Sequence, residues 1–252
     1  MNNIQRPSFS VITATYNSGE IFNRTAISLA HQQFKDFEWI VIDGGSGDDT
    51  ISHIQAHGEF VNRWISERDC GISDAWNKGL RWARGRYILI LNAGDTYDPD
   101  FLQRVHAHIG SASKVICSHA RLLSESGEHV GIIRSEPDKL YRAMHLAHNW
   151  CAVPHEHYDQ LGGYADMKLA MDFEWFHRYY LRYGVSGFTV IDAQLGSYYL
   201  GGASDINYAE SFRTNAQILT LHGTARSVAM FWRVIYTLKH ALRIWNLKKF
   251  AR

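Results

Sequence analysis

Four apolar segments in the first hundred residues limit what this chain can fold into. They cover residues 9–17, 37–42, 63–66 and 87–91. Helical patterns separate them, at 18–34, 50–57 and 71–85. Strands that are apolar almost throughout are buried on both faces, which is typical of a parallel sheet covered by helices on both sides. We expect an α/β fold with a Rossmann-like, mostly parallel central sheet.

The chain departs from this alternation after Pro99. The pattern predicts a helix over 100–109, a pair of strands around 114–134, and an aromatic-rich helix near 172–183. No internal repeat or low-complexity linker separates the two parts. We therefore expect two half-domains that share one continuous sheet and divide near residue 98.

Composition is that of a soluble globular protein, with 46% apolar and 20% charged residues among 252. The three cysteines are odd in number and lack CxxC spacing, which disfavours a disulfide framework or a thiolate zinc site. We find neither a secretory signal nor an apolar run long enough to span a bilayer. These features predict a cytoplasmic protein.

Charge is divided unevenly along the chain, although the net charge is only +1. Residues 1–210 carry 18 basic and all 25 acidic residues, whereas 211–252 carry eight basic and no acidic residues. In this tail, apolar residues recur at intervals of three and four: Phe231, Val234, Ile235, Leu238, Leu242 and Trp245. Basic residues lie between or beyond them: Arg233, Lys239, Arg243, Lys248 and Lys249.

Such a pattern predicts a basic amphipathic helix over 226–252. We expect it to contact an anionic membrane peripherally, at the inner face of the cell membrane. The same apolar stripe could instead dock on the core or pair with another subunit of an oligomer. A nucleic-acid partner is disfavoured, because the body of the chain is net acidic and carries no known reading motif.

Polar residues mark the carboxyl end of each strand predicted in the first half. They are Thr13, Thr15 and Tyr16; Asp43; Arg68 and Asp69; and Asn92 and Asp95. Ligands of an open parallel sheet bind outside these ends, so we expect the polar groups to converge on one crevice. The chain has neither a GxGxxG turn nor a GxxxxGK[ST] loop, which disfavours a Rossmann dehydrogenase and a P-loop protein.

Four segments resemble the successive motifs of glycosyltransferase family 2. They read SVITATYNSG, WIVIDGGSGDDT, SERDCGISDAWNKGLRWARGRYILILNAGD and DFEWFHRY. The resemblance runs from about residue 8 to residue 205, and is to bacterial enzymes of exopolysaccharide, O-antigen and colanic-acid assembly. It implies a GT-A fold in which residues 1–98 bind a nucleotide sugar, residues 99–210 bind the acceptor and carry the catalytic group, and residues 211–252 form the tail.

The reaction implied by this resemblance is a metal-dependent, inverting transfer. The donor would be a UDP- or GDP-sugar, and the acceptor a glycan or a polyprenyl-diphosphate-linked oligosaccharide in bacterial surface polysaccharide biosynthesis. The alternative is a catalytically degenerate nucleotide-sugar-binding subunit that recruits partners through its basic tail. A reduced acidic motif in the chain suggests this alternative.

That motif is the DxD-type sequence of the family, which here reads NAGD. The resemblance implies that Asp95 is the main protein ligand of Mn²⁺ or Mg²⁺, with Asn92, Ala93 and Gly94 bordering the donor. Asn92 can offer only a neutral oxygen, so diphosphate and water must supply much of the metal shell unless Asp98 assists. The alternative is that these residues form a turn and nothing more.

The resemblance assigns further residues to the donor. Asp43 would accept a hydrogen bond from the nucleobase, bordered by Thr13, Thr15 and Tyr16; the alternative for Asp43 is a helix cap or turn. In the segment ERDCGISDAWNKG, Arg68 and Lys78 are cations for the diphosphate, and Asp69, Asp74 and Asn77 orient ribose or loop backbone. Solvated helix charges are the alternative for this segment.

An inverting transfer needs a general base for the acceptor hydroxyl. The resemblance places this carboxylate at the amino end of the helix in LAMDFEWFHRYY, which selects Asp172. Glu174 lies two positions on and faces elsewhere on the helix, and it is expected to bind the acceptor. The alternative is that both acids only start the helix. In the predicted acceptor-side loop 151–166, His155 is expected to line the sugar or acceptor pocket and His157 to be structural. Residues 198–205 resemble a loop that closes over the site.

Overall fold

The computed structural model describes residues 6–202 and 207–250, with side chains as far as Leu242. Its first half contains four parallel strands: β1 (Phe9–Thr15), β2 (Phe37–Asp43), β3 (Arg63–Ser66) and β4 (Tyr87–Ile90). The helices between them are α1 (Ile21–Ala30), α2 (Thr50–Ala56) and α3 (Ile72–Trp82). The sheet order here is β3-β2-β1-β4, and every adjacent pair is parallel. The predicted alternation of strand and helix is confirmed.

The sheet continues through the second half of the chain in the order β8-β6-β9-β5. Its strands are β5 (Thr96–Tyr97), β6 (Val115–Leu123), β7 (His129–Ile133), β8 (Cys151–Pro154) and β9 (Phe188–Tyr199), with β7 paired to β6. The helices are α4 (Phe101–Ala107), α5 (His155–Leu161) and α6 (Met171–Tyr183). Short 3-10 turns are η1 (Pro137–Lys139), η2 (His148–Trp150) and η3 (Val185–Gly187).

Two segments of the second half differ from the sequence prediction. The predicted loop 151–166 contains strand β8, which pairs antiparallel with both β4 and β6, and helix α5. Strand β9 was not predicted, although it pairs with β6 in parallel over most of its length. β8 has only four residues and gains its hydrogen bonds from two distant strands, so local periodicity gives little sign of it.

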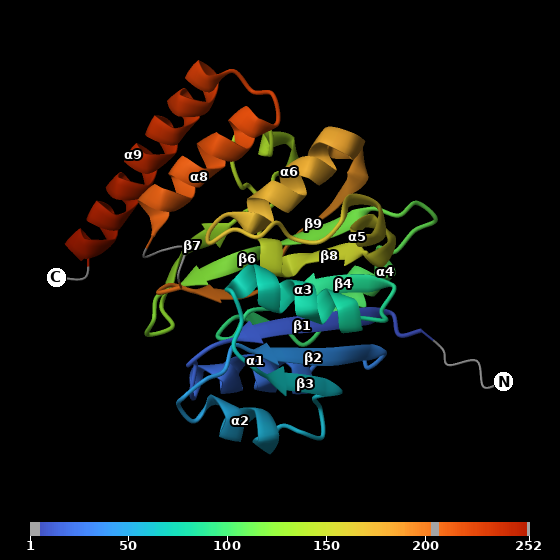
Figure 1. Cartoon of the computed structure of the whole chain (residues 1–252). Coiled ribbons are helices and arrows are strands. Elements are labelled where there is room, and N and C mark those ends of the chain that lie inside the picture. Colours follow the sequence, from blue (N-terminus) through green and yellow to red (C-terminus); the bar gives the residue numbers. More distant parts are fainter. Residues whose placement is uncertain (1–5, 203–206, 251–252) are drawn as a thin grey trace.

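Side chains of the central strands alternate between the two faces of the sheet. Val11, Val41 and Leu89 pack with residues of α1, α2 and α4, whereas Ile12 and Ile88 pack with residues of α3 and α6. Figure 1 shows α3 and α6 over one face of the sheet. Both faces are therefore buried, which explains the continuous apolar sequence of these strands.

The chain ends in a helical hairpin of α8 (Tyr208–Leu221) and α9 (Arg226–Phe250), which lies beside α6 in Figure 1. The predicted tail 211–252 is therefore two helices, and the amphipathic segment coincides with α9. One face of α9 packs inward: the ring of Tyr236 stacks on Phe212 of α8, and Trp232 contacts Tyr141. The opposite face remains exposed, at Phe231, Val234, Leu238 and Leu242.

Part of the tail prediction lies outside the described residues, since the side chains of Trp245, Arg243, Lys248 and Lys249 are beyond Leu242. The predicted closing loop 198–205 is described only as far as residue 202. Over the part of the chain that the structure describes, no helix combines the length and the apolar content needed to cross a bilayer.

Gly85 offers a test of how closely α3 is joined to the sheet. A Cβ at this buried position would lie 2.3 Å from the backbone N of Ser10 and 2.5 Å from the backbone C of Phe9. We expect Gly85→Ala to lower the free energy of unfolding by about 1–3 kcal/mol, because the backbone of β1 must shift. Gly110→Ala is the matched control, since nothing lies within 4 Å of its added Cβ. Equal midpoints of urea unfolding for the two variants would contradict the prediction.

Candidate active site

The carboxyl ends of the four parallel strands meet at one edge of the sheet. The Gly44 N–H donates to the Thr15 carbonyl (2.9 Å), and the Glu67 N–H donates to the Asp43 carbonyl (3.0 Å). The Leu91 N–H donates to the Ile12 carbonyl (2.9 Å). The polar residues that follow these strands are therefore brought together in space, as the predicted crevice requires.

Asp43 is fully buried and its carboxylate is held by several donors. Oδ2 accepts hydrogen bonds from the Gly45 N–H (3.1 Å), the Ser46 N–H (2.9 Å) and the Ser66 hydroxyl (2.6 Å). The Ser46 hydroxyl donates to Oδ1. These contacts favour the turn interpretation of Asp43, which joins the loop after β2 to β3. A contact between Asp43 and a nucleobase stays a prediction.

Tyr16 and Asp69 approach each other over Gly44. A Cβ at Gly44 would lie 2.8 Å from Asp69 Oδ2 and 3.3 Å from Tyr16 Cδ2, so the absent side chain leaves room for both. The Tyr16 side chain is 65% exposed, and the exposed Arg68 follows β3 beside it. Tyr16, Arg68 and Asp69 thus follow β1 and β3 at the edge where the crevice is predicted, and they offer a ring face, a cation and an anion.

Thr13 and Thr15 do not share this exposure. Thr13 is fully buried, and its hydroxyl accepts a hydrogen bond from Trp39 Nε1 at 2.9 Å. Thr15 is nearly buried, and its hydroxyl pairs with that of Ser18. Alternation along β1 turns the Thr13 side chain into the core on the α1 side, so its contact with a nucleobase stays a prediction that this burial disfavours.

Three predicted donor residues on α3 are engaged within the protein. Lys78 Nζ lies 2.8 Å from Glu67 Oε1 and 3.3 Å from Asp74 Oδ2. Burial by itself lowers the pKa of Lys78, but the two carboxylates outweigh it and the pKa is raised. Asn77 donates to the Tyr164 carbonyl (2.8 Å) and accepts from the Tyr164 N–H (2.9 Å). The loop-backbone interpretation of Asn77 thus agrees with its contacts, while donor contacts by Asp74 and Lys78 require these ion pairs to open.

The turn after β4 is held against helix α1. The Gly94 N–H donates to the Thr25 hydroxyl (2.9 Å), which in turn donates to the Asp95 carbonyl (2.8 Å). Gly94 has φ +102°, in the region that favours glycine, and Ala93 lies half-buried before it. Asn92 Oδ1 accepts from Trp76 Nε1 at 3.1 Å. Asn92 is thus committed to α3 in this structure.

The Asp95 side chain points inward and is only 6% exposed. Its Oδ2 accepts a hydrogen bond from Asn149 Nδ2, and its Oδ1 accepts one from the Tyr199 N–H at 3.2 Å. The Asp98 carboxylate pairs with both terminal nitrogens of Arg121, so its assistance in metal binding would require this ion pair to open. Asp95 itself is held in a fixed orientation by Asn149 and Tyr199.

Asp172 lies in the first turn of α6 with its side chain 27% exposed. Its Oδ1 accepts from the Phe173 N–H at 2.8 Å, and its Oδ2 lies 4.0 Å from His148 Nδ1. Burial lowers the pKa of the His148 imidazole, and the nearby charge of Asp172 offsets this only in part. Ala170, directly before the helix, adopts φ +63°, which sets the direction in which α6 begins.

Glu174 is engaged within the protein. Its side chain is 9% exposed and pairs with Arg178 Nε at 2.7 Å. It also lies 3.5 Å from Nε2 of His222, the residue that follows α8. Contact between Glu174 and the acceptor stays a prediction, and it would require the pair with Arg178 to open.

His155 lies at the opposite edge of the sheet. Its N–H donates to the Arg86 carbonyl (2.9 Å), and its ring Nδ1 lies 2.6 Å from Arg6 Nη2 and 3.0 Å from the Gly85 carbonyl. β8 runs antiparallel to β4, so the residue after β8 arrives where β4 begins. This position disfavours the acceptor role predicted for His155, which stays a prediction. His157 is structural, as expected: its Nε2 contacts the Ser113 carbonyl at 2.9 Å, and its ring packs against Tyr179.

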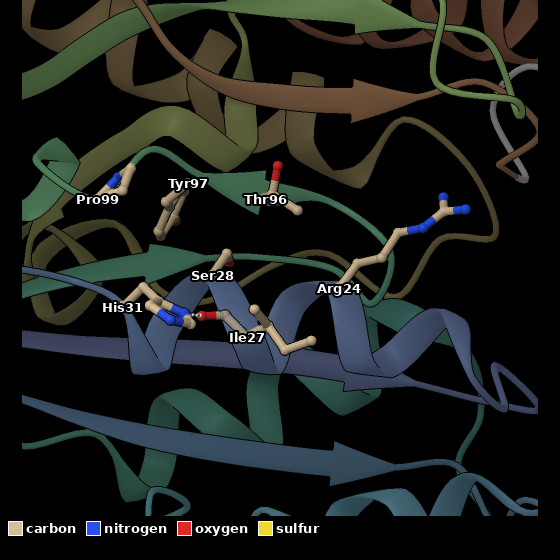
Figure 2. A pocket seen from close by; sticks show the side chains of 7 residues that line it. All are labelled: Arg24, Ile27, Ser28, His31, Thr96, Tyr97 and Pro99. Atoms are coloured by element: carbon tan, nitrogen blue, oxygen red, sulfur yellow. Dashed lines mark hydrogen bonds between the residues drawn. The ribbon is translucent and has the colours of Figure 1, made fainter.

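A cavity of about 390 Å³ adjoins the outer side of the Asp95 turn (Figure 2). It is lined by Arg24, Ile27, Ser28, His31, Thr96, Tyr97 and Pro99. The Arg24 guanidinium lies 4.4 Å from the ring centre of Tyr199, the residue whose N–H contacts Asp95. The residues predicted for donor or acceptor do not line this cavity.

Four residues near the two carboxylates were missed by sequence reasoning: Trp76, His148, Asn149 and Tyr199. Trp76 was within a recognised motif, but its side chain was read as part of a helix. His148 and Asn149 precede the short strand β8, and Tyr199 ends the long strand β9. The sequence pattern predicts neither strand, so it carries no sign that these residues reach the site.

The family model for glycosyl transferase family 2 matches residues 10–168. The chain belongs to glycosyltransferase family 2. A PGL/p-HBAD biosynthesis glycosyltransferase of Mycobacterium bovis is 38% identical over 108 residues, which are 41% of this chain and 42% of the relative. The Bacillus subtilis protein EpsH is 28% identical over 129 residues, covering 50% of this chain and 37% of EpsH.

Two solved structures share the fold. Residues 1–349 of S. aureus TarS, in complex with UDP-GlcNAc, match with a TM-score of 0.67 at 19% identity, over 92% of this chain and 72% of that one. The mannosyltransferase PcManGT of Pyrobaculum calidifontis, in complex with GDP-Man and Mn²⁺, matches with a TM-score of 0.66 at 17% identity, over 98% and 80%. The predicted GT-A fold is thus confirmed. The alignments span about two fifths of the curated relatives' length.

The placement of His155 can be tested against that of Tyr16. For a nucleotide-sugar transferase, we expect His155→Ala to leave kcat and the acceptor KM at wild-type values, and to lower stability by about 1 kcal/mol through lost hydrogen bonds. Tyr16→Ala, at the edge of the predicted crevice, should raise the donor KM. Steady-state kinetics and urea unfolding check both. A raised acceptor KM in His155→Ala would support the acceptor assignment instead.

Proposed function

We propose that this chain transfers a sugar from a UDP- or GDP-sugar to a hydroxyl group of a glycan or lipid-linked oligosaccharide, with inversion, in bacterial surface polysaccharide biosynthesis. The observation that carries the proposal is the convergence of two carboxylates, Asp95 and Asp172, at the carboxyl edge of a parallel sheet. Consecutive residues of η2 contact both of them. In this proposal Asp95 holds the metal that stabilises the departing diphosphate, and Asp172 accepts the proton of the attacking hydroxyl.

Tyr16, Asp69 and Arg68 suit a nucleoside diphosphate. The exposed Tyr16 ring offers a face to a nucleobase, and Asp69 offers an acceptor to the base or ribose beside it. Arg68 follows directly, and no carboxylate of the described part of the chain forms an ion pair with it in the structure. Its guanidinium is therefore available to neutralise diphosphate charge.

Asp95 is the residue that would hold Mn²⁺ or Mg²⁺. Its hard carboxylate oxygens suit either ion, and Asn149 and Tyr199 orient them. The described residues contain no cluster of three ligating His, Cys, Asp or Glu side chains, so the protein would supply one carboxylate. Donor oxygens and water would complete the shell. When bound, the metal would supply Lewis-acid stabilisation of the diphosphate.

Asp172 is proposed to accept the proton of the acceptor hydroxyl. A general base must be ionised and reachable, and this carboxylate is partly exposed at the start of α6. The hydroxyl oxygen then attacks the anomeric carbon from the face opposite the nucleotide, which inverts that centre.

Two substitutions separate these roles. We expect Asp172→Asn to keep donor binding and to lower kcat by about 10²–10⁴-fold, because it cannot take the proton. Asp95→Asn should instead weaken Mn²⁺-dependent binding of the nucleoside diphosphate, measured by calorimetry with UDP and with GDP. Full turnover by Asp172→Asn at saturating donor would exclude it as the base, and metal-dependent binding unchanged in Asp95→Asn would exclude it as the ligand.

A second candidate function is a nucleotide-sugar-binding subunit without catalysis. It is favoured by the single carboxylate of the NAGD turn and by the engagement of Asn92 and Asp98 with Trp76 and Arg121. The two candidates are distinguished by incubating the wild-type protein with UDP- and GDP-sugars, Mn²⁺ and a lipid-linked acceptor. Transfer or hydrolysis of a donor supports the enzyme, whereas binding without either supports the subunit.

We further propose that α9 contacts an anionic membrane surface, which would bring a lipid-linked acceptor close to the crevice. Its outward face exposes four apolar side chains: Phe231, Val234, Leu238 and Leu242. Residues 211–252 contain eight basic residues and no acidic residue. An apolar stripe on a basic helix matches the boundary between lipid headgroups and acyl chains.

Sedimentation with lipid vesicles tests this surface. We expect the protein to bind vesicles rich in anionic lipid, to bind zwitterionic vesicles less, and to be released by salt. The double variant Leu238→Glu/Leu242→Glu should reduce binding about tenfold or more, because burying each leucine contributes at least 1.5 kcal/mol. Leu181→Glu is the matched control, as Leu181 is similarly exposed but lies on α6. Absence of vesicle binding, or a dimer that the double variant abolishes, would overturn the membrane assignment.

A further inference from the structure

Two consecutive residues, His148 and Asn149, contact the two carboxylates of the crevice. Asn149 Nδ2 donates to Asp95 Oδ2, and His148 Nδ1 lies 4.0 Å from Asp172 Oδ2. The two acids are far apart in the sequence and belong to different halves of the fold, whereas the residues that contact them are neighbours in η2. The short turn η2 thus spans the distance between the two halves of the site.

The backbone of η2 is fixed from several sides. The Tyr97 hydroxyl donates to the Asn149 carbonyl at 2.7 Å, and the Trp150 N–H donates to the Ala147 carbonyl at 2.8 Å. Trp150 is 1% exposed and belongs to the core cluster under α1 and α4. Displacing η2 would therefore expose a tryptophan and break buried hydrogen bonds, so its position is determined by the core rather than by the ligands of the crevice.

Asn149 is buried and its amide links the metal-side turn at two points. Besides its bond to Asp95, its Oδ1 lies 3.5 Å from Asn92 Nδ2. Asn92 is in turn bound to Trp76 of α3. Because the Asn149 amide is itself held by Asn92, it leaves the Asp95 carboxylate little freedom to rotate.

His148 is held in a comparable way. Its ring lies 4.9 Å from the ring of Trp76 and 6.5 Å from that of Phe176, which precludes a large swing. Nε2 is buried and makes no hydrogen bond among the described residues, whereas Nδ1 faces Asp172. At 4.0 Å the two atoms do not form a hydrogen bond in this structure, and a small approach of the side chains would let an Nδ1–H group donate to the carboxylate.

We propose that His148 and Asn149 are positioning residues that together set the geometry between the diphosphate-side carboxylate Asp95 and the acceptor-side carboxylate Asp172. The inference rests on the proposed function and deepens it. Asn149 orients Asp95 before any metal arrives. The His148 ring limits the position of Asp172 Oδ2, whose partner oxygen Oδ1 is held by the Phe173 N–H. Because both residues sit on one rigid turn, the two carboxylates keep their separation through the catalytic cycle.

The consequences for the two residues differ, and this difference makes the proposal testable. Loss of the Asn149 amide should weaken metal binding about 10–100-fold, as expected for an outer partner of a metal ligand. Loss of the His148 N–H should leave donor and metal binding intact and lower kcat about tenfold or more, since it acts on the base alone. Substitution of a residue needed only for folding would lower stability, and would not weaken metal binding in one variant and kcat in the other.

The experiment uses the full chain and four variants. Asn149→Ala and His148→Leu remove the contacts, and Asn215→Ala and His177→Leu are matched controls that remove a buried amide and a buried imidazole elsewhere. Mn²⁺ binding in the presence of UDP or GDP is followed by the electron paramagnetic resonance signal of free Mn²⁺, and kcat and KM are measured with the donor found to turn over. Urea unfolding reports the stability of each variant.

We expect weaker Mn²⁺ binding only in Asn149→Ala, and lower kcat at unchanged donor KM in His148→Leu. His148→Asn, whose amide can replace the Nδ1–H donor, should recover at least about tenfold of that loss and should fold if His148→Leu does not. Behaviour of the two variants like that of their controls would overturn the proposal while leaving the transferase function standing. A wild-type protein without turnover would refute the proposed function instead, and the Mn²⁺ measurement would still decide the role of Asn149.

Discussion

The site depends on the parallel pairing of β1 with both of its neighbours. β1 pairs with β2 from Phe9↔Phe37 to Thr15↔Asp43, and with β4 from Phe9↔Tyr87 to Ile12↔Ile90. Parallel neighbours must be joined by crossover helices, so each strand starts at one edge and ends at the other. The turn at Asp43 and the turn at Asp95 are thereby delivered to the same edge, and the apolar sequence of the strands follows from burial on both faces.

One antiparallel strand then decides what the second half contributes. β8 runs against β4, so the residues before it lie at the carboxyl edge and the residues after it lie at the amino edge. His148 and Asn149 precede β8 and reach the carboxylates, whereas His155 follows β8 and contacts Arg6 and the backbone of Gly85. The antiparallel direction of the four-residue strand β8 thus explains why His148 and Asn149 lie near the two carboxylates. It also explains why His155 lies at the opposite edge of the sheet.

The structure also divides the motif residues by what their polar atoms contact. Asp43, Asn77 and Lys78 are satisfied within the protein, where they hold the turn after β2, the loop at Tyr164 and the loop after β3. Tyr16 and Arg68 remain exposed. Buried polar groups need partners, so residues of one motif serve two purposes: some build the crevice and others are left to contact what enters it. A motif read from sequence does not distinguish the two.

By itself, the sequence determined the four strands and three helices of the first half, their parallel arrangement, and the family. These depend on hydrophobic periodicity and on short motifs, which are local and can be read along the chain. It also indicated Asp95 and Asp172, because each stands at a recognisable point of an element. Only the tertiary structure decided that Thr13 and Glu174 are buried, that His155 is remote, and that His148 and Asn149 join the two carboxylates. The physical reason is that polar side chains find their partners across strands distant in sequence, and the short strand β8 that arranges them is stabilised by those strands rather than by its own four residues.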